Sequence, residues 1–276
     1  MKESFVTVKP NLPNLQKLIA YYYFHSSTEE NYTSKFTYYP NVKNALTIYR
    51  NSEIILDSDY NTKANPSKEK YFFTYTKLIH QFASAEIHAP FDKIGIVFQP
   101  LGINHFIDQN LSELVKNTFN LNFRYFQESM TPFLNQIYSI NNMADKARHL
   151  DEYFNSIYCG FEEVKLERAL VLLDDKIVKY TVQSLAKELN ISRKTLLRLF
   201  NKHLCCSVKD YLNVVHFRRA LNIYNSYKDK SVLVNLALDA EYYDQSQFIN
   251  HFKKLTGFNP KKFFKKIAQF GEEGTF

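Results

Sequence analysis

The sequence predicts an α+β protein in two parts: a β-rich barrel or sandwich followed by helices, then an all-α domain of two helix-turn-helix units joined by a long helix. Three observations predict this fold class. Short β-branched and aromatic runs fill residues 1–122. From about Leu111, apolar residues recur at spacings of three and four. The segment Phe200–Tyr211 is repeated in construction 52 residues later, at Phe252–Phe263.

Residues 1–122 are expected to form the β-rich domain. Turns rich in Asn, Pro, Ser and Asp, such as 38–44 and 61–70, separate its candidate strands. Residues 12–24 begin with helical spacing and end as an extended aromatic run. The expected strands are 5–8, 45–49, 53–56, 71–76 and 93–98. Runs spaced in this way indicate an antiparallel barrel or sandwich.

Helical spacing continues through the middle of the chain, at 111–119, 131–140 and 144–158. We expect residues 123–162 to be a helical connector, with a boundary near Cys159–Glu163. After this boundary the pattern is helical throughout, which predicts a separate domain at 163–270.

Positive charge is concentrated in the C-terminal part. From Glu163 to Phe276 there are 20 Lys and Arg residues against 12 Asp and Glu, whereas the first 162 residues hold 15 and 16. This asymmetry indicates a polyanionic partner for that part, although a solvated lysine-rich surface explains the charge alone equally well. No apolar run reaches the roughly 18 residues that span a bilayer, and no signal peptide is recognised. We therefore expect a cytoplasmic protein with no membrane partner.

Residue patterns for metal or covalent chemistry are missing from the sequence. The three cysteines, Cys159, Cys205 and Cys206, form no C-x-x-C spacing, and the eight histidines form no H-x-H or H-E-x-x-H pattern. No G-x-S-x-G or Gly-rich phosphate loop occurs. We expect no metal, no cofactor and no enzymatic activity, with Cys205 and Cys206 reduced and half-buried.

The first copy of the repeat has the construction of a helix-turn-helix. Thr181 is expected to cap one helix and Ser192 the next, and Asn190 between them tolerates the left-handed backbone of a tight turn. The expected apolar side of the second helix is Leu196, Leu197, Leu199 and Phe200. The residues expected to point outward near its start are Arg193, Lys194, Thr195 and Arg198.

The second copy has the same construction, with one extra residue in its turn. Ser231 is expected to cap a helix, and Asp244 caps the next helix, with Phe248 and Phe252 inward. The expected apolar residues of the first of these helices are Leu233, Leu236 and Ala237. The residues expected to face outward from the second are Gln245, Ser246, Gln247 and Asn250.

One long helix, Ser207–Tyr227, is expected between the two copies. About 18 residues at 1.5 Å each span roughly 27 Å, which suits two reading helices in major-groove turns roughly 34 Å apart. At the end of the second copy, Gly257 provides a turn and Asn259 caps a last helix that Pro260 opens. The residues expected outside this turn, where phosphates would lie, are Lys253, Lys254, Lys261 and Lys262.

The C-terminal hundred residues resemble the DNA-binding domain of AraC/XylS-type bacterial transcription regulators. Three motifs carry the resemblance: A-x-x-L-x-x-S-x-x-x-L-x-R-x-F at 186–200, S-x-x-x-Y-L at 207–212, and D-Q-S-x-F-x-x-x-F-K-K-x-x-G-x-N-P-x-x-F at 244–263. In that family a long helix joins two helix-turn-helix units, and the third and sixth helices enter the major groove of double-stranded DNA.

The resemblance implies roles for the outward residues when the DNA-contacting positions of the family are transferred to the matching positions of this sequence. Arg193, Lys194 and Arg198 would read or anchor the first groove segment, and Gln245, Ser246, Gln247 and Asn250 would occupy the second. This sequence departs from the family pattern at several places. His216 and Val208 stand where Arg and Pro are usual, Cys205 and Glu241 take places common for Gly, and Asn250 replaces a frequent arginine.

The N-terminal half looks like the β-rich domain found on a subset of these regulators. The resemblance implies a sensing or dimerising role, hence a small-molecule effector and a homodimer, and contact with RNA polymerase if the protein is an activator. Packing in strands is favoured over an effector pocket for one group of aromatic residues, namely Tyr21, Tyr22, Tyr23, Tyr38 and Tyr39.

Two other functions remain open at this point. One is a helical protein-interaction module that uses the basic face for an acidic partner. The other is a DNA-repair enzyme with an attached DNA-binding module, since some relatives carry an alkyl-accepting cysteine; here the N-terminal half has only Cys159.

Overall fold

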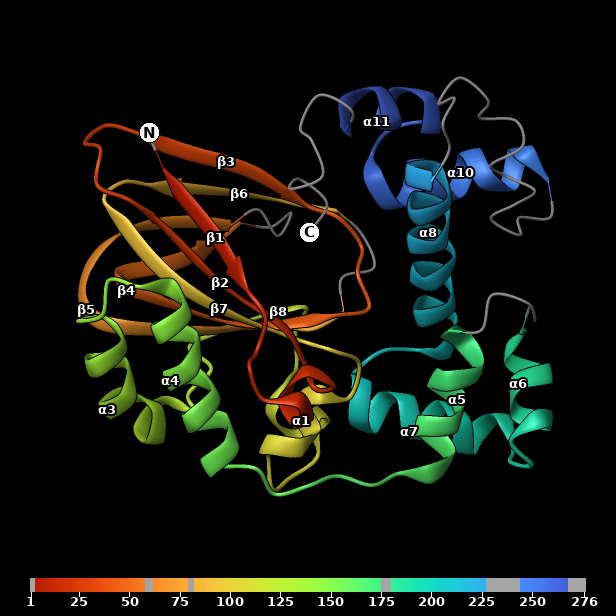
Figure 1. Cartoon of the computed structure of the whole chain (residues 1–276). Helices are drawn as coiled ribbons and strands as arrows, with labels where there is room; N and C mark the ends of the chain where they lie inside the picture. Colours follow the sequence, from red (N-terminus) through yellow and green to blue (C-terminus); the bar gives the residue numbers. More distant parts are fainter. Residues whose placement is uncertain (1–2, 58–61, 79–81, 175–179, 227–243, 268–276) are drawn as a thin grey trace.

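A sheet-containing N-terminal part and a helical C-terminal part lie side by side (Figure 1). The computed structural model describes residues 3–57, 62–78, 82–174, 180–226 and 244–267. Within these residues, no helix is long and apolar enough to cross a membrane.

The N-terminal part is built on one curled, barrel-like sheet, as expected. Its strands in the described residues are β1 (Ser4–Val8), β2 (Ile19–Ser27), β3 (Thr33–Tyr38), β4 (Asn44–Leu56), β5 (Thr62–Thr76), β6 (Ala83–His88), β7 (Phe91–Phe98) and β8 (Phe119–Leu121). They pair in the order β1-β2-β7-β4-β5-β6-β3, and β8 pairs with β5. All ladders are antiparallel except β5 with β6.

The sheet contains three strands that were not among the expected ones, β3, β6 and β8, and it differs from the expectation in two further places. The runs at 45–49 and 53–56 belong to one strand, β4, in which Asn51 adopts a left-handed conformation (φ 53°) and the pairing with β5 shifts register between Arg50 and Ser52. The predicted turn at 61–70 is wrong over most of its length, since residues 62–66 pair with β4. Pairing with a long neighbouring strand has overridden the local turn propensity of this polar segment.

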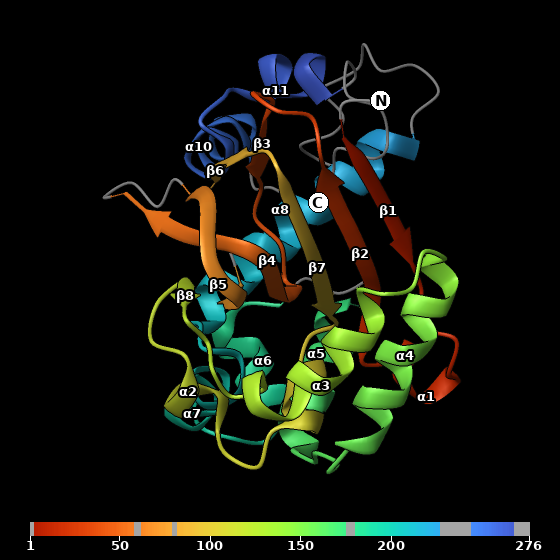
Figure 2. The ribbon, with the colours of Figure 1, turned by 90° about the vertical axis from the view of Figure 1, so that its left-hand side faces the viewer.

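Five helices in the described residues of the N-terminal part accompany the sheet; the first lies between β1 and β2, and the others come after β7. They are α1 (Pro13–Gln16), the 3₁₀ helix η1 (Gly102–Phe106), α2 (Leu111–Leu114), α3 (Gln127–Ile137) and α4 (Met143–Ser156). Figure 2 shows α3 and α4 side by side next to the sheet. Ile96 of the sheet, Leu134 of α3 and Phe154 of α4 share one buried core. The helix predicted at 111–119 stops at Leu114, and the chain continues into β8.

The C-terminal part is helical, as expected. Its described helices are α5 (Val164–Asp174), α6 (Val182–Glu188), α7 (Arg193–Leu204), α8 (Val208–Ser226), α10 (Gln245–Thr256) and α11 (Pro260–Ile267). α8 joins two apolar cores: Tyr211 packs with α7 in the first, and Phe217 packs with α10 in the second. The predicted helix with Leu233, Leu236 and Ala237, its cap Ser231, and the turn residue Glu241 lie outside the described residues.

The N-terminal part contacts both of these helical cores. Arg218 on α8 donates from Nε to the carbonyl oxygen of Pro40 and from Nη2 to that of Tyr39, the latter at 3.2 Å. Burial lowers the pKa of the Arg218 guanidinium to about 10. Beside the first core, Asn104 Nδ2 donates to the carbonyl oxygen of His203 on α7 at 3.0 Å.

Candidate nucleic-acid interface

The first helix-turn-helix is held by the predicted caps and turn. Thr181 Oγ1 accepts from the Ser184 backbone N–H at 3.1 Å, and Ser184 Oγ accepts in return from the Thr181 N–H. Asn190 is left-handed at φ 52°, and Ser192 Oγ accepts from the Thr195 N–H at 3.0 Å. These local interactions fix where α7 begins and how it leaves the turn.

The outward face of α7 is polar and basic. Leu196 and Phe200 are fully buried, so the opposite side of the helix faces solvent. Arg193, Lys194 and Arg198 are exposed, and Thr195 is half-buried. A helix surface of this kind is suited to phosphate oxygens and to the acceptor atoms of guanine.

Leu197 does not belong to the apolar side of α7, contrary to the expectation. Its side chain is 42% exposed. One helical residue turns the side chain by about 100°, so Leu197 leaves the buried line of Leu196 and Phe200. It lies instead one turn after Arg193 and next to Arg198.

The second reading helix, α10, is built in the same way. Asp244 Oδ1 accepts from the Gln247 N–H at 2.7 Å and caps the helix. Phe248 and Phe252 are buried, as predicted. The predicted outward residues are all exposed: Gln245, Ser246, Gln247 and Asn250.

The 52-residue repeat extends from sequence to backbone geometry. Cys205 ends α7 with φ 54°, and Gly257 ends α10 with φ 76°, so the two equivalent residues are both left-handed. Ser207 Oγ accepts from the Asp210 N–H at 3.0 Å, and the equivalent Asn259 Oδ1 accepts from the Lys262 N–H at 2.8 Å. In the described residues, the reading helix and the turn that follows it are therefore built alike in the two copies.

The aromatic pair at the end of the second copy closes its turn from inside. The rings of Phe252 and Phe263 pack edge to face at 5.8 Å, and both are fully buried. The predicted basic residues around this turn, Lys253, Lys254, Lys261 and Lys262, are all exposed. Lys262 Nζ lies 5.2 Å from the centre of the Phe258 ring, which holds its charge close to the turn.

The long helix between the two copies is confirmed. α8 has 19 residues, which correspond to about 28 Å at 1.5 Å per residue. Because Tyr211 and Phe217 anchor it in the two cores, it fixes the separation of α7 and α10.

The tyrosine-rich residues of the N-terminal part make packing contacts, Tyr22 and Tyr23 within β2 and Tyr39 just after β3. Tyr22 is fully buried and donates to Asp151 Oδ1 on α4 at 2.7 Å. Tyr23 OH lies 2.8 Å from Thr47 Oγ1, and the Tyr39 ring packs against Phe263 of α11. These contacts agree with the packing interpretation.

Sequence reasoning did not predict a buried cation in the sheet. Lys93 is only 2% exposed, and its Nζ lies 4.6 Å from the centre of the Phe36 ring and 5.5 Å from that of Tyr49. Burial lowers the pKa of the Lys93 ammonium to about 7, although the Glu3 carboxylate favours the charged form. Lys93 is the first residue of the expected strand 93–98, and a lysine at the start of a strand is ordinarily expected to face solvent. The alternation of polar and apolar residues therefore could not reveal this buried cation.

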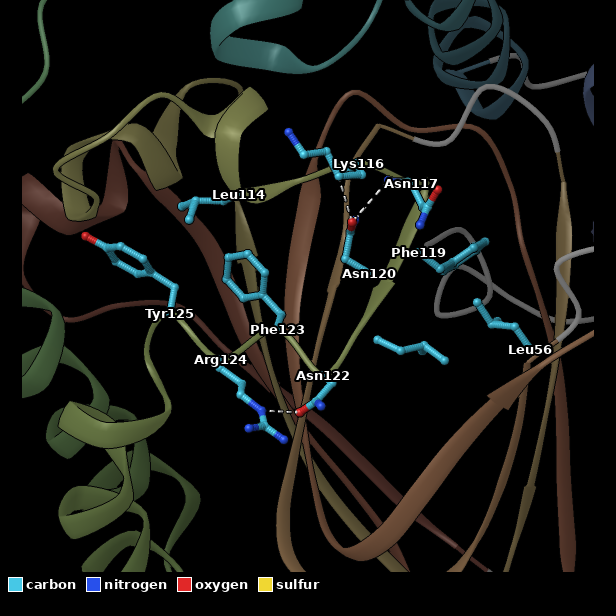
Figure 3. A pocket seen from close by; sticks show the side chains of 11 residues that line it. Leu56, Leu114, Lys116, Asn117, Phe119, Asn120, Asn122, Phe123, Arg124 and Tyr125 are labelled. Carbon is cyan, nitrogen blue, oxygen red and sulfur yellow. Dashed lines mark hydrogen bonds between the residues drawn. The ribbon is translucent and has the colours of Figure 1, made fainter.

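A pocket of about 480 Å³ lies next to β8 (Figure 3). Leu56, Phe119 and Phe123 give it apolar walls, with Lys116 and Arg124 at its margin. Several of its polar groups are joined to one another. Arg124 Nε donates to Asn122 Oδ1 at 2.9 Å, and Asn120 Oδ1 accepts from the backbone N–H groups of Lys116 and Asn117.

The described residues hold no cluster of three or more His, Cys, Asp or Glu that could bind a metal ion. All three cysteines are free; Cys205 and Cys206 are half-buried, as expected, and Cys159 is exposed. Burial raises the pKa of the Cys205 thiol to about 11 and also raises that of Cys206. Such thiols are poorly suited to nucleophilic chemistry.

One family model matches part of the chain, and several solved structures align with most of it. Residues 185–266 match a family described as a helix-turn-helix domain. Among solved structures, ToxT from Vibrio cholerae in its P21 crystal form is 13% identical, with 95% of this chain and 98% of that chain covered and a TM-score of 0.47. An apo ToxT variant is 12% identical, with 94% and 99% covered and a TM-score of 0.46.

Two further ToxT structures are described as ligand complexes. One is described as bound to an unsaturated fatty acid, at 12% identity, 85% and 96% coverage and a TM-score of 0.45. The other contains (E)-4-(8-methylnaphthalen-1-yl)but-3-enoic acid, at 13% identity, 95% and 98% coverage and a TM-score of 0.47. A comparison with curated proteins finds no significant match.

Proposed function

We propose that the protein is a DNA-binding transcription regulator that inserts α7 and α10 into successive major-groove segments of promoter DNA. The match of residues 185–266 to a helix-turn-helix family supports this proposal. The observation that carries the proposal is the structural repeat. Two capped helices, 52 residues apart, expose polar first turns on either end of one 19-residue helix.

The two kinds of contact have different tasks in this proposal. Lys253, Lys254, Lys261 and Lys262 neutralise phosphates and supply affinity that does not depend on sequence. Arg193, Lys194 and Arg198, with Thr195 beside them, anchor and read the first groove segment. In the second segment, Gln245 and Gln247 pair with adenine, which presents a donor and an acceptor to an amide, and Ser246 and Asn250 complete the contact surface.

The length of α8 supports a fixed spacing of the two contacts. About 28 Å of helix compares with roughly 34 Å for one helical turn of DNA, and α7 and α10 pack against opposite halves of this helix. Whole-chain selection of duplexes from a random library should therefore enrich two short boxes whose centres lie about 10 base pairs apart.

Spacer insertion tests the same geometry. Adding about half a helical turn between the boxes places the second box on the opposite face of the duplex. We expect the affinity of the full chain to fall to that for a duplex with one box. An undiminished affinity would contradict simultaneous insertion. Failure to enrich any sequence over random duplex would instead favour the protein-interaction module.

We further propose that the N-terminal part fixes the placement of the two units, so that a small-molecule effector or a second copy of the chain acts on DNA binding through it. The Arg218 hydrogen bonds to Tyr39 and Pro40, and that of Asn104 to His203, support this role. Arg218 is half-buried against the N-terminal part and does not belong to the proposed DNA surface. Contact with RNA polymerase, if the protein activates transcription, would require a further surface.

Substituting Arg218 tests the coupling. Arg218→Gln should weaken binding to a two-box operator severalfold and leave a one-box duplex almost unaffected, because fixed placement matters only when both helices are engaged. Fluorescence anisotropy with the two duplexes at one salt concentration measures the difference. An equal loss on both duplexes would point to general damage of the fold rather than to coupling.

A further inference from the structure

We infer that Leu197 and Ile249 are specificity-determining residues, each of which recognises the 5-methyl group of a thymine in its own groove segment. The inference rests on the proposed function, since it concerns what α7 and α10 read in the DNA. It adds an apolar element to a surface otherwise described by its cations, hydroxyls and amides.

The first observation is an exposed aliphatic side chain on each reading helix. Leu197 is 42% exposed and Ile249 is 38% exposed. The two residues are 52 positions apart, so they occupy the same place in the two copies. Among the large hydrophobic residues exposed in the described part of the chain, these two are the ones that lie on α7 and α10.

The second observation concerns the residues that neighbour Leu197 and Ile249 on the helix surface. Residues three and four apart are neighbours on a helix, so Leu197 lies beside Lys194 and Arg193 and precedes Arg198. By the same rule, Ile249 lies beside Ser246 and Gln245 and precedes Asn250. Each aliphatic group is thus surrounded by side chains proposed to contact the DNA, and a helix lying in the groove brings it to the base edges too.

The chemistry of the major groove selects one base for such a group. Thymine alone among the four bases presents a methyl group there, while the other edges are hydrogen-bond donors and acceptors that a leucine or isoleucine cannot satisfy. A single exposed leucine on a protein surface is ordinary. Equivalent exposure in both copies, within two otherwise polar faces, is what points to a shared apolar target.

Deoxyuridine separates the methyl group from every other feature of thymine. In the duplex with two selected boxes, each thymine is replaced singly by deoxyuridine, which keeps the base pair and the O4 acceptor. The wild-type chain should lose about fourfold in affinity, the effect of removing one buried methyl-sized group from a contact, at one or more positions in each box.

Alanine variants then assign the methyl contacts to residues. Leu197→Ala should bind thymine and deoxyuridine equally at the sensitive positions of the first box and keep the difference in the second. Ile249→Ala should do the reverse, so each variant controls for the other. Both side chains are exposed, and circular dichroism verifies that each variant keeps the fold.

The outcomes separate this inference from the function on which it rests. If the wild-type chain selects two boxes but is insensitive to deoxyuridine, or the boxes lack thymine, the inference is overturned and the proposed function stands. Methyl sensitivity that persists in both alanine variants also overturns it, because another residue then makes the contact. If the chain selects no sequence, the proposed function itself fails.

Discussion

The two helix-turn-helix units share their framework and differ in their outward chemistry. Each reading helix begins at a side-chain cap, Ser192 or Asp244, and ends at a left-handed residue, Cys205 or Gly257. Near the start of α7 the exposed residues are mainly cationic, whereas near the start of α10 they are neutral amides and a hydroxyl. The framework depends on caps and buried rings, so the exposed positions are free to diverge towards different tasks.

The units also differ in how they meet the N-terminal part. The first contacts η1 through the hydrogen bond from Asn104 to the His203 carbonyl, and α2 packs against α7. The second packs aromatic rings: Tyr39 lies against Phe263, and Phe82 lies over Gly257. Apolar residues meet both units, since Leu101 belongs to the core of the first, and the second also has the hydrogen bonds of Arg218. Different residues of the N-terminal part hold the two units, so a perturbation of the sheet need not affect both equally.

The largest effect is expected from the cations of the first unit. Arg198→Ala should weaken operator binding by about 1–3 kcal/mol, because a guanidinium that reads or anchors the groove loses both charge and hydrogen bonds. Asn250→Ala, at the equivalent place in the second unit, should cost less and leave the salt dependence unchanged, since no charge is removed. Salt-controlled anisotropy titrations of both variants measure this difference. Wild-type affinity in Arg198→Ala would remove that residue from the site.

Much of the framework of the two reading helices was predictable from sequence, because their caps and turns depend on residues that are close together in the chain. Thr181, Ser192 and Asp244 were recognised as caps from their positions before apolar runs, and each accepts the backbone hydrogen bond expected of a cap. Asn190 has the left-handed backbone that its turn requires. Interactions within a few residues leave a signature that one sequence can reveal.

Features that depend on distant partners were not predictable in the same way. Residues 62–66 look like a turn and become a strand because β4 lies beside them. Leu197 looked like a core residue, since four apolar residues crowd one short stretch and only the packed structure decides which faces outward. Lys93 is enclosed by rings from other strands, which its own segment cannot reveal.

A smaller effect, on the stability of the fold, is expected at the C-terminal ends of α7 and α10, which carry different residues. Gly257→Ala should destabilise the protein by about 1–2 kcal/mol, the cost of a left-handed backbone for a residue with a Cβ. A Cβ there would also lie 3.0 Å from the Phe82 ring. Cys205→Ala is the matched control, because its backbone is already left-handed with a side chain present. Denaturant unfolding compares the two, and equal losses would show that the ends are energetically alike.

The smallest effect is expected from a single lysine outside the reading helices. Lys262→Ala should weaken binding to selected and random duplexes alike and reduce the slope of log affinity against log salt by about one unit, because one phosphate contact and its released counterion are lost. Lys187, exposed on α6 and outside the proposed surface, supplies the control: Lys187→Ala should leave the slope unchanged. If Lys262→Ala weakens binding to one sequence only, Lys262 reads a base. In the second unit, phosphate contacts and base contacts would then no longer be divided between the residues outside the reading helix and the reading helix itself.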